Sequence, residues 1–276
     1  MDRTSGDRTS GDRTSGDGTA AARWEQALAA WGIPEHILAR APQSPWIHPV
    51  ALFVATGQEP DTPSHRAARE VLPAGGTVLD VGCGGGRAAF ALTPPAARVV
   101  GVDHQQSMLD SFGAAAAERG VEHVEVLGDW PDVAAVTPEA DVVVSHHVAY
   151  NVAALAPFGL ALSAKARRRV VLELPVRHPL SRMAPLWQRF WDLDRPLGPT
   201  ARDAADVLRE AGLAVRLDEW DDPAPPREAA VDPAEQVRYT RVRLCLPADR
   251  DPEVAAALAE LGPPGPRRLA TISWDV

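Results

Sequence analysis

The sequence has few cysteines, no long apolar run and no recognisable export signal. The spacing of its two cysteines, Cys83 and Cys245, matches neither a metal site nor a disulfide framework. Its longest apolar stretch, residues 152–164, contains Pro157 and is shorter than the ~20 residues of a membrane-spanning helix. The amino terminus lacks the apolar core of a secretion signal. We therefore expect a cytoplasmic protein with free thiols, without a bound metal and without a membrane partner.

Lysine is nearly absent, and basic residues are outnumbered by acidic ones. Lys165 is the one lysine among 28 basic residues, and the formal net charge is -9. An acidic surface repels phosphate backbones, so binding to a nucleic acid would need a local basic patch. Residues 165–169 (KARRR) keep RNA open as an alternative, although they directly precede an apolar strand and suit its solvated entry. We expect a small-molecule partner, and the oligomeric state is not indicated.

Three regions differ in composition. Residues 1–20 contain DRTSG three times in succession, which predicts a disordered tail because the repeat has no core-forming side chains. Residues 21–73 are expected to form a helical amino-terminal cap, since Trp24, Leu28 and Trp31 recur at helical spacing. A proline-rich loop in this region carries Trp46 and His48, which either pack on the core or cap a site. Residues 74–276 are expected to form the main domain.

The main domain alternates between β-rich and helical runs from Gly76 to Leu174. Such alternation is typical of an α/β fold with a parallel sheet and helices on both faces. Further along, we expect a helix at residues 200–211, a strand at 213–220, helical stretches at 233–244 and 252–261, and a final strand at 268–274. The predicted fold is a Rossmann-like, seven-stranded, mostly parallel sheet whose final strand is antiparallel.

A glycine-rich turn follows the first strand of this domain. The strand TVLDV runs into GCGGG, so that Gly82, Gly84 and Gly86 lead into a helix, and Asp80 precedes them. Glycine suits this position because a Cβ would obstruct the tight turn and hold a ligand away from the backbone. The turn predicts a nucleotide-binding site.

The run LDVGCGGG, residues 79–86, resembles motif I of the class I S-adenosylmethionine-dependent methyltransferases. The resemblance implies a methyltransferase with S-adenosylmethionine as cofactor, whose methionine half passes this loop. The second strand ends in Asp103, about twenty residues beyond the glycines, where a carboxylate can accept hydrogen bonds from both ribose hydroxyls. His104 would lie beside the nucleoside.

The ends of the next two strands complete the predicted site. By the same resemblance, Asp129 accepts from the adenine amino group and Trp130 lies beside it, after the third strand. The fourth strand ends in SHHVAYN, where Ser145 faces the cofactor. General-base candidates at this end, for an acceptor that must lose a proton, are His146, His147 and Tyr150.

The segment after the fifth strand, residues 173–199, is the expected acceptor wall or lid, because ligands bind at the carboxyl ends of parallel strands. Its apolar side chains recur at helical spacing, which suits either core packing or substrate contact: Met183, Trp187, Phe190 and Trp191. Its polar side chains at the start of the segment could orient an acceptor: Glu173, Arg177 and His178.

Two other functions fit parts of this pattern. A nicotinamide-dependent oxidoreductase would share the glycine turn and Asp103, although Arg87 stands where its fingerprint has a last glycine. A cofactor-binding protein without catalysis would share the whole cofactor motif. The sequence lacks the Asn/Asp-Pro-Pro-Tyr and Pro-Cys motifs of two DNA-methylating classes, so those base methylations are not expected.

Overall fold

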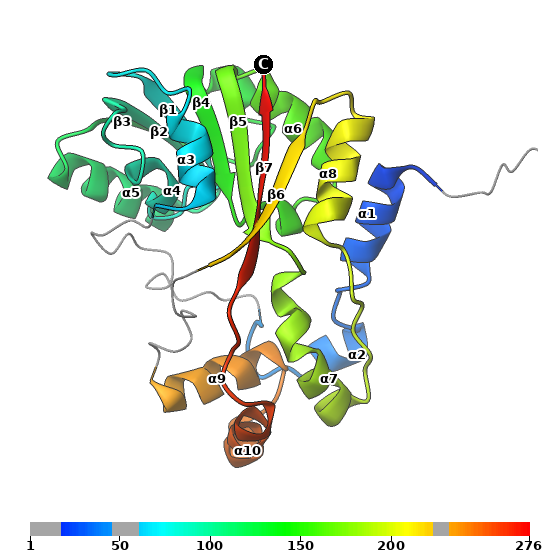
Figure 1. Ribbon diagram of the computed structural model, residues 1–276. Helices are drawn as coiled ribbons and strands as arrows, with labels where there is room; N and C mark the ends of the chain where they lie inside the picture. The colour runs from blue at the N-terminus through cyan, green and yellow to red at the C-terminus, as the bar shows by residue number, and fades with distance from the viewer. Residues whose placement is uncertain (1–17, 46–60, 223–231) are drawn as a thin grey trace, which may run out of the picture.

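The computed structural model describes residues 18–45, 61–222 and 232–276, and a seven-stranded sheet forms its centre (Figure 1). The strands lie in the order β3-β2-β1-β4-β5-β7-β6. Strand β7 is antiparallel to β5 and β6, while the other neighbours pair in parallel. The predicted sheet with an antiparallel final strand is confirmed. Its strands are β1 (Thr77–Val81), β2 (Arg98–Asp103), β3 (Glu122–Leu127), β4 (Ala140–His146), β5 (Ala166–Pro175), β6 (Arg216–Asp221) and β7 (Arg268–Asp275).

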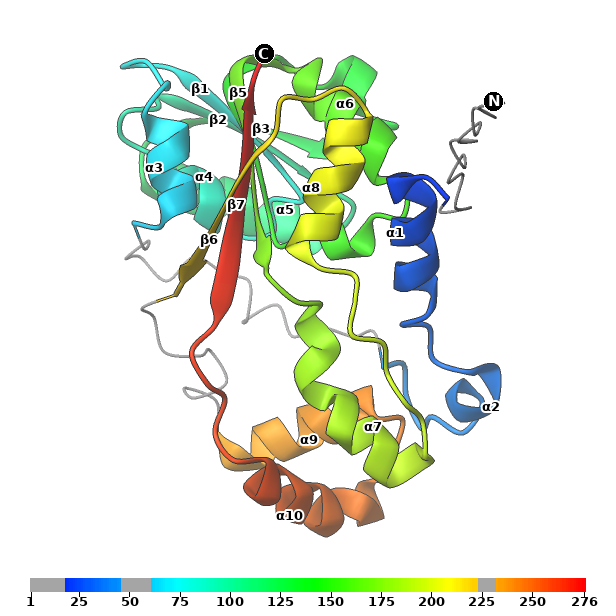
Figure 2. The same ribbon diagram turned by 45° about the vertical axis from the view of Figure 1, so that its right-hand side comes forward.

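Helices cover both faces of the sheet, and alternate residues of the central strands face opposite layers. Val78 packs in one layer and Leu79 in the other. The layer of Val78 contains residues of α3 (Pro63–Arg69), α4 (Arg87–Phe90) and α5 (Gln106–Glu118). The layer of Leu79 contains residues of α1 (Ala20–Ala29), α6 (Leu155–Ser163) and α8 (Ala201–Glu210) (Figure 2). This two-sided burial explains the near-continuous apolar sequences of β1, β4 and residues 170–174 of β5.

A separate group of helices forms a lobe at one end of the sheet (Figures 1 and 2). We call it the helical lobe. It consists of α2 (Glu35–Leu38), α7 (Ala184–Trp191), α9 (Pro233–Arg243) and α10 (Asp251–Leu261), which share one apolar cluster. The lobe lies opposite the chain's carboxyl terminus, where the antiparallel β7 ends, so it adjoins the carboxyl ends of the parallel strands.

The helices of residues 21–73 pack in three different places. Helix α1 lies on α8, α2 belongs to the helical lobe, and α3 contacts β5 and β7. The division of the chain into a cap and a main domain therefore stays a prediction. Most of the expected disordered tail, and the loop positions Trp46 and His48, lie outside the described residues.

The later elements lie close to their predicted bounds. The helix expected at residues 200–211 is α8, whose Thr200 and Asp203 form a capping box, and the final strand begins at Arg268. Among the described residues, four short 3₁₀ segments connect other elements: Ala134–Val136, Ala149–Asn151, Pro179–Met183 and Ala248–Arg250. Within the described part of the chain, no helix has the length and apolar character required to cross a bilayer.

Candidate functional site

The predicted glycine turn is a compact loop at the carboxyl end of β1. Gly82, Gly84 and Gly86 have φ angles of 72°, 50° and 83°, in the left-handed region that favours glycine. The backbone N–H groups of Gly82 and Cys83 both donate to the Val102 carbonyl, at 2.8 and 3.0 Å. The loop is thereby attached to the adjacent strand β2.

The structure adds a further reason why two of these positions are glycine. A Cβ on Gly82 would lie 2.4 Å from a methyl group of Val148, in the loop after β4. A Cβ on Gly86 would lie 2.1 Å from the ring of Phe90 in α4. Neighbouring side chains, together with the left-handed backbone, therefore disfavour a side chain at these two positions.

Asp103 ends β2 and joins the loops on either side of it. One carboxylate oxygen accepts a hydrogen bond from the Gly84 N–H and the other from the Gln105 N–H, each at 3.0 Å. The side chain is 9% exposed, and a carboxylate offers about four acceptor positions. Asp103 can therefore hold both loops and still accept hydrogen bonds from a ligand.

Asp80 does not line the loop surface as a free carboxylate. It is 1% exposed, and its Oδ2 accepts from the Ala89 N–H of α4 at 3.2 Å. Burial, together with the nearby charge of Asp103, raises the pKa of Asp80 from 3.8 to about 7. The carboxyl of Asp80 therefore supports the loop from inside.

The third strand end lies beside Asp103. The Gly128 N–H donates to the Asp103 carbonyl at 3.0 Å, and Asp129 follows with an exposed side chain. Trp130 is half-buried, and its indole N–H approaches the Phe158 carbonyl at 3.4 Å. His104 has a 62% exposed side chain. The structure therefore brings together the glycine turn, Asp103 and the Asp129–Trp130 segment.

The fourth strand end separates the two histidines. Ser145 is buried, and its hydroxyl donates to the Val81 carbonyl at 2.8 Å, which joins β4 to β1. His146 has an 8% exposed side chain, and burial lowers its pKa to about 3. His147 is 32% exposed. A buried neutral imidazole is a weak proton acceptor at neutral pH, so the geometry favours His147 over His146 as a base.

Glu173 at the end of β5 is the centre of a buried polar cluster. Its Oε1 lies 3.3 Å from His147 Nε2 and 3.9 Å from His146 Nδ1. Its Oε2 accepts from the Thr62 hydroxyl at 3.0 Å, and the Thr62 hydroxyl lies 3.0 Å from His65 Nδ1. The ring of His65 lies 5.2 Å from that of His146.

Sequence reasoning missed Thr62 and His65. The Thr-Pro start of α3 indicates a helix cap, and Thr62 and His65 form a capping box there. No local pattern shows that this cap contacts the ends of β4 and β5, because the contact with Glu173 spans more than a hundred residues of sequence.

Tyr150 is held in an aromatic stack. Its hydroxyl donates to the Pro175 carbonyl at 2.8 Å, its ring stacks on Trp24, and it meets the ring of His178 edge-on. Burial raises the pKa of Tyr150 above its ordinary value. These contacts suit a structural residue, and a phenol with a raised pKa gains no basicity at neutral pH.

The predicted acceptor wall divides between packing and surface. Trp187 is 2% exposed in the core of the helical lobe, where Met183, Phe190 and Trp191 are partly buried, so core packing accounts for the helical spacing. His178 is buried and stacks on Trp31 with ring centroids 4.0 Å apart. Arg177 is exposed.

Comparison with known proteins agrees with this geometry. Residues 78–162 match a family model described as a methyltransferase domain. The cypemycin N-terminal methyltransferase of a Streptomyces species is 48% identical over 59 residues, which are 21% of this chain and 23% of that protein. The match thus spans about a quarter of the relative's length.

Two solved structures share the fold. The YcgJ protein of Bacillus subtilis aligns with a TM-score of 0.52 at 18% identity, over 77% of this chain and 97% of the other. A candidate methyltransferase from Bacillus halodurans aligns with a TM-score of 0.51 at 17% identity, over 77% and 96%. Residues 78–162 therefore match a methyltransferase domain, and they lie within a seven-stranded sheet of Rossmann-like fold.

Proposed function

We propose that this protein transfers a methyl group from S-adenosylmethionine to a small-molecule acceptor. The observation that carries the proposal is the junction of the left-handed glycine turn with Asp103, whose carboxylate is fixed by Gly84 N–H at the carboxyl end of β2. Strand ends of this kind are where doubly wound sheets bind nucleotides. The match of residues 78–162 to a methyltransferase domain supports the same chemistry.

The residues at the strand ends fit the proposed cofactor. Asp103 would accept from the ribose hydroxyls, and residues 82–86 would pass the methionine half, with Asp80 supporting the loop from below. Asp129, Trp130 and His104 would surround the adenosine, and Ser145 would keep β4 beside β1. When bound, S-adenosylmethionine supplies an electrophilic methyl group. Aligning an acceptor lone pair with that group can contribute ~7 to 11 kcal/mol.

His147 is the proposed general base for an acceptor that loses a proton. It is more exposed than His146, and such a base contributes ~10²- to 10⁴-fold in rate. The relative named for methylating the cypemycin amino terminus shares this requirement, since an ammonium group must lose a proton before its nitrogen can attack. We propose an amine-bearing small molecule as the first acceptor class to test.

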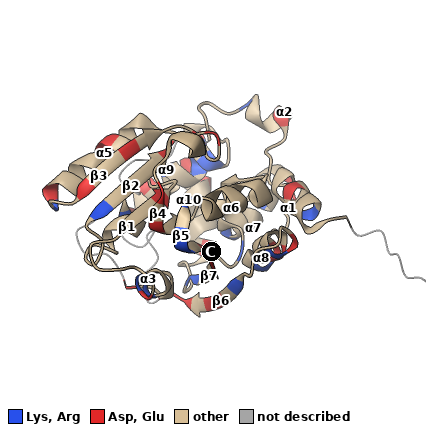
Figure 3. Cartoon of the chain, turned by 90° about the horizontal axis from the view of Figure 1, so that it is seen from above, with Lys and Arg blue, Asp and Glu red and all other residues tan. Residues whose placement is uncertain are grey.

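Charge distribution supports a small molecule over a nucleic acid. In the view of Figure 3, Lys and Arg residues are interspersed with Asp and Glu residues. Two arginines of the basic run at residues 165–169 already form ion pairs within the protein. Arg169 pairs with Glu70 and with Asp275, and Arg168 lies 3.7 Å from Asp141. We also propose that the protein acts in the cytoplasm.

Calorimetry and isotope transfer test the proposal. Purified protein should bind S-adenosylhomocysteine at micromolar strength and NAD much more weakly, whereas the reverse preference would establish the oxidoreductase alternative. Incubation of cell extracts with methyl-labelled S-adenosylmethionine, followed by mass spectrometry, should then identify a labelled small molecule. Cofactor binding without any labelled product, across extracts of the source cells, would favour the non-catalytic alternative.

A further inference from the structure

We propose that Glu173 is a positioning residue, which holds His147 with its proton on Nε2 so that Nδ1 receives the acceptor's proton. The inference rests on the proposed methyl transfer. In the step, the acceptor X–H gives its proton to the Nδ1 lone pair, the X–C bond forms, and the methyl–sulfur electron pair stays on sulfur. Glu173 touches neither acceptor nor cofactor in this arrangement.

His147 and Glu173 contact each other through both their side chains and their backbones. His147 Nε2 lies 3.3 Å from Glu173 Oε1, and the His147 backbone N–H donates to the Glu173 carbonyl at 2.6 Å. An ionised carboxylate can only accept, so it selects the tautomer whose proton is on the facing nitrogen. That tautomer leaves Nδ1 with a lone pair.

The backbone of His147 is an independent indication of function. Its φ is +63°, in the left-handed region that non-glycine residues rarely adopt. Such conformations persist when surrounding contacts hold them, and they cluster at functional sites. The turn directly follows β4, so it sets where the imidazole lies relative to the strand ends. Glycine would adopt this backbone conformation more easily, yet the position holds a histidine whose imidazole lies beside the buried Glu173 carboxylate.

The surroundings keep Glu173 ionised and fixed. The residue is 5% exposed, and burial opposes its ionisation, but hydrogen bonds from His147 and hydroxyl donors hold its pKa below the ordinary value. The titratable groups that face it come from two elements besides its own strand: His146 and His147 at the end of β4, and His65 through the Thr62 hydroxyl of α3.

His146 does not fit the role of general base. Its ring is almost fully buried, and its Nε2 has no hydrogen-bond partner among the described residues. Burial lowers the pKa of His146 to about 3, so the ring stays neutral near pH 7. The partial exposure of His147 makes its side chain the accessible one of the pair.

Long-range ¹H–¹⁵N spectra of imidazole-labelled protein, saturated with S-adenosylhomocysteine, test the tautomer directly. The His147 signals are identified by their loss in His147→Asn, a variant whose residue also tolerates a left-handed backbone. We expect the wild type to show the Nε2–H tautomer. We expect Glu173→Gln, whose amide can also donate, to show a mixture of tautomers or the Nδ1–H form. A wild-type Nδ1–H tautomer, or an unchanged tautomer in Glu173→Gln, would overturn the proposal.

The chain provides a matched control on its surface. His123 Nδ1 lies 2.6 Å from Glu125 Oε1 on β3, so Glu125→Gln should change the His123 signals and leave those of His147 unchanged. Calorimetry should show S-adenosylhomocysteine affinity within about twofold of wild type in Glu173→Gln. Failure of the wild type to bind that ligand would instead count against the proposed function. With the labelled acceptor, His147→Asn should lose ~10²- to 10⁴-fold in kcat, and a wild-type kcat would contradict the role of His147.

Discussion

At the residue scale, Asp80 makes stability depend on pH. Its folded pKa of about 7 exceeds the unfolded 3.8, so its protonated form stabilises the fold below pH 4, and this contribution is lost as the pH rises to 7. A shift of this size corresponds to at most about 4 kcal/mol. Asn does not ionise, so Asp80→Asn should not lose stability as the pH rises. In urea unfolding, the variant should be more stable than wild type at pH 8 and similarly stable at pH 4.

Asp275 provides the opposite case for comparison. Its pKa lies below 3.8 because Arg169 donates to it, so its contribution is present above pH 4 and is lost on acidification. Asp275→Asn should therefore destabilise the protein at both pH 5 and pH 8. A stability difference between Asp80→Asn and wild type that is equal at pH 4 and pH 8 would show that Asp80 titrates normally.

Asp103→Ala tests the ribose contact. Hydrogen bonds to a charged group contribute ~1.5 to 3 kcal/mol, so the variant should bind S-adenosylhomocysteine roughly 10- to 150-fold more weakly by calorimetry. The variant should also lose some thermal stability, because the carboxylate holds the Gly84 and Gln105 N–H groups. Analogues lacking the 2′- or 3′-hydroxyl separate the two effects. If the variant discriminates them as strongly as wild type, Asp103 does not bind the ribose.

The sequence located most strand-end residues but not the environment of each. Asp80, Asp103 and Ser145 follow from where the strands end, because parallel strands bring their carboxyl ends to one edge. Whether a side chain is buried depends on neighbours from distant segments. The burial of His146 and the contact of Thr62 with Glu173 are of this kind.

At the element scale, Trp24 joins α1 to the loop after β4. Trp24 is fully buried, stacks on Tyr150, and donates its indole N–H to the Val152 carbonyl at 2.9 Å. Trp24→Ala should cost about 3 to 5 kcal/mol of unfolding free energy, measured with urea. Trp24→Phe keeps the ring contact and should cost ~0.5 to 1.5 kcal/mol for the lost hydrogen bond.

Truncation gives a second measure of α1. Removing residues 1–17 should leave thermal stability unchanged, because the DRTSG repeat cannot bury apolar surface. Thr19 must remain, since its hydroxyl accepts from the Ala22 N–H and caps α1. A truncation that also removes residues 18–30 should lower the melting temperature, and equal melting temperatures would contradict the packing of α1.

The periodicity of the sequence predicted elements better than their partners. Strands β1, β2 and β4 were predictable because buried parallel strands are apolar along most of their length. Helix α7 was recognisable from the spacing of Trp187 and its neighbours, yet an apolar stripe does not state what it packs against. The structure pairs α7 with α2, α9 and α10 in a lobe core that no single segment encodes.

At the scale of the whole molecule, the sheet and the helical lobe should respond differently to ligands. The proposed cofactor contacts lie at residues 82–86 and 103–105, whereas α10 packs in the separate lobe cluster. Hydrogen–deuterium exchange should therefore show slower exchange at those two segments on addition of S-adenosylhomocysteine, with little change in α10. Protection concentrated in α10 would place the cofactor in the lobe.

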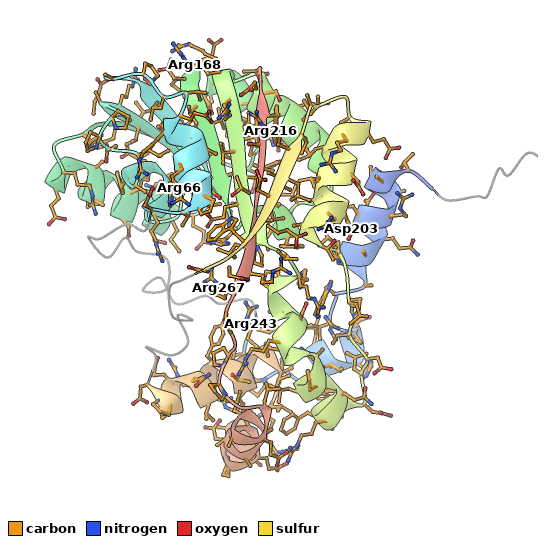
Figure 4. All side chains as sticks on the ribbon, in the orientation of Figure 1. Arg66, Arg168, Asp203, Arg216, Arg243 and Arg267 are labelled. Carbon is orange, nitrogen blue, oxygen red and sulfur yellow. The ribbon has the colours of Figure 1, made fainter. Side chains whose placement is uncertain are left out.

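Helices α9 and α10 of the helical lobe lie between β6 and β7 in the sequence, and the chain leaves and re-enters the sheet at one point. Asp222 N–H donates to the Arg267 carbonyl at 2.8 Å, beside the paired residues Asp221 and Arg268 of β6 and β7, and Arg267 marks this junction in Figure 4. Helices α9 and α10 are thus an insertion between two adjacent strands. A chimera could exchange residues 223–266, together with α7, for the corresponding part of another protein with this fold, without interrupting the parallel strands. The strand ends that carry the proposed cofactor site and the helical lobe would then become separable parts of one chain, open to independent engineering.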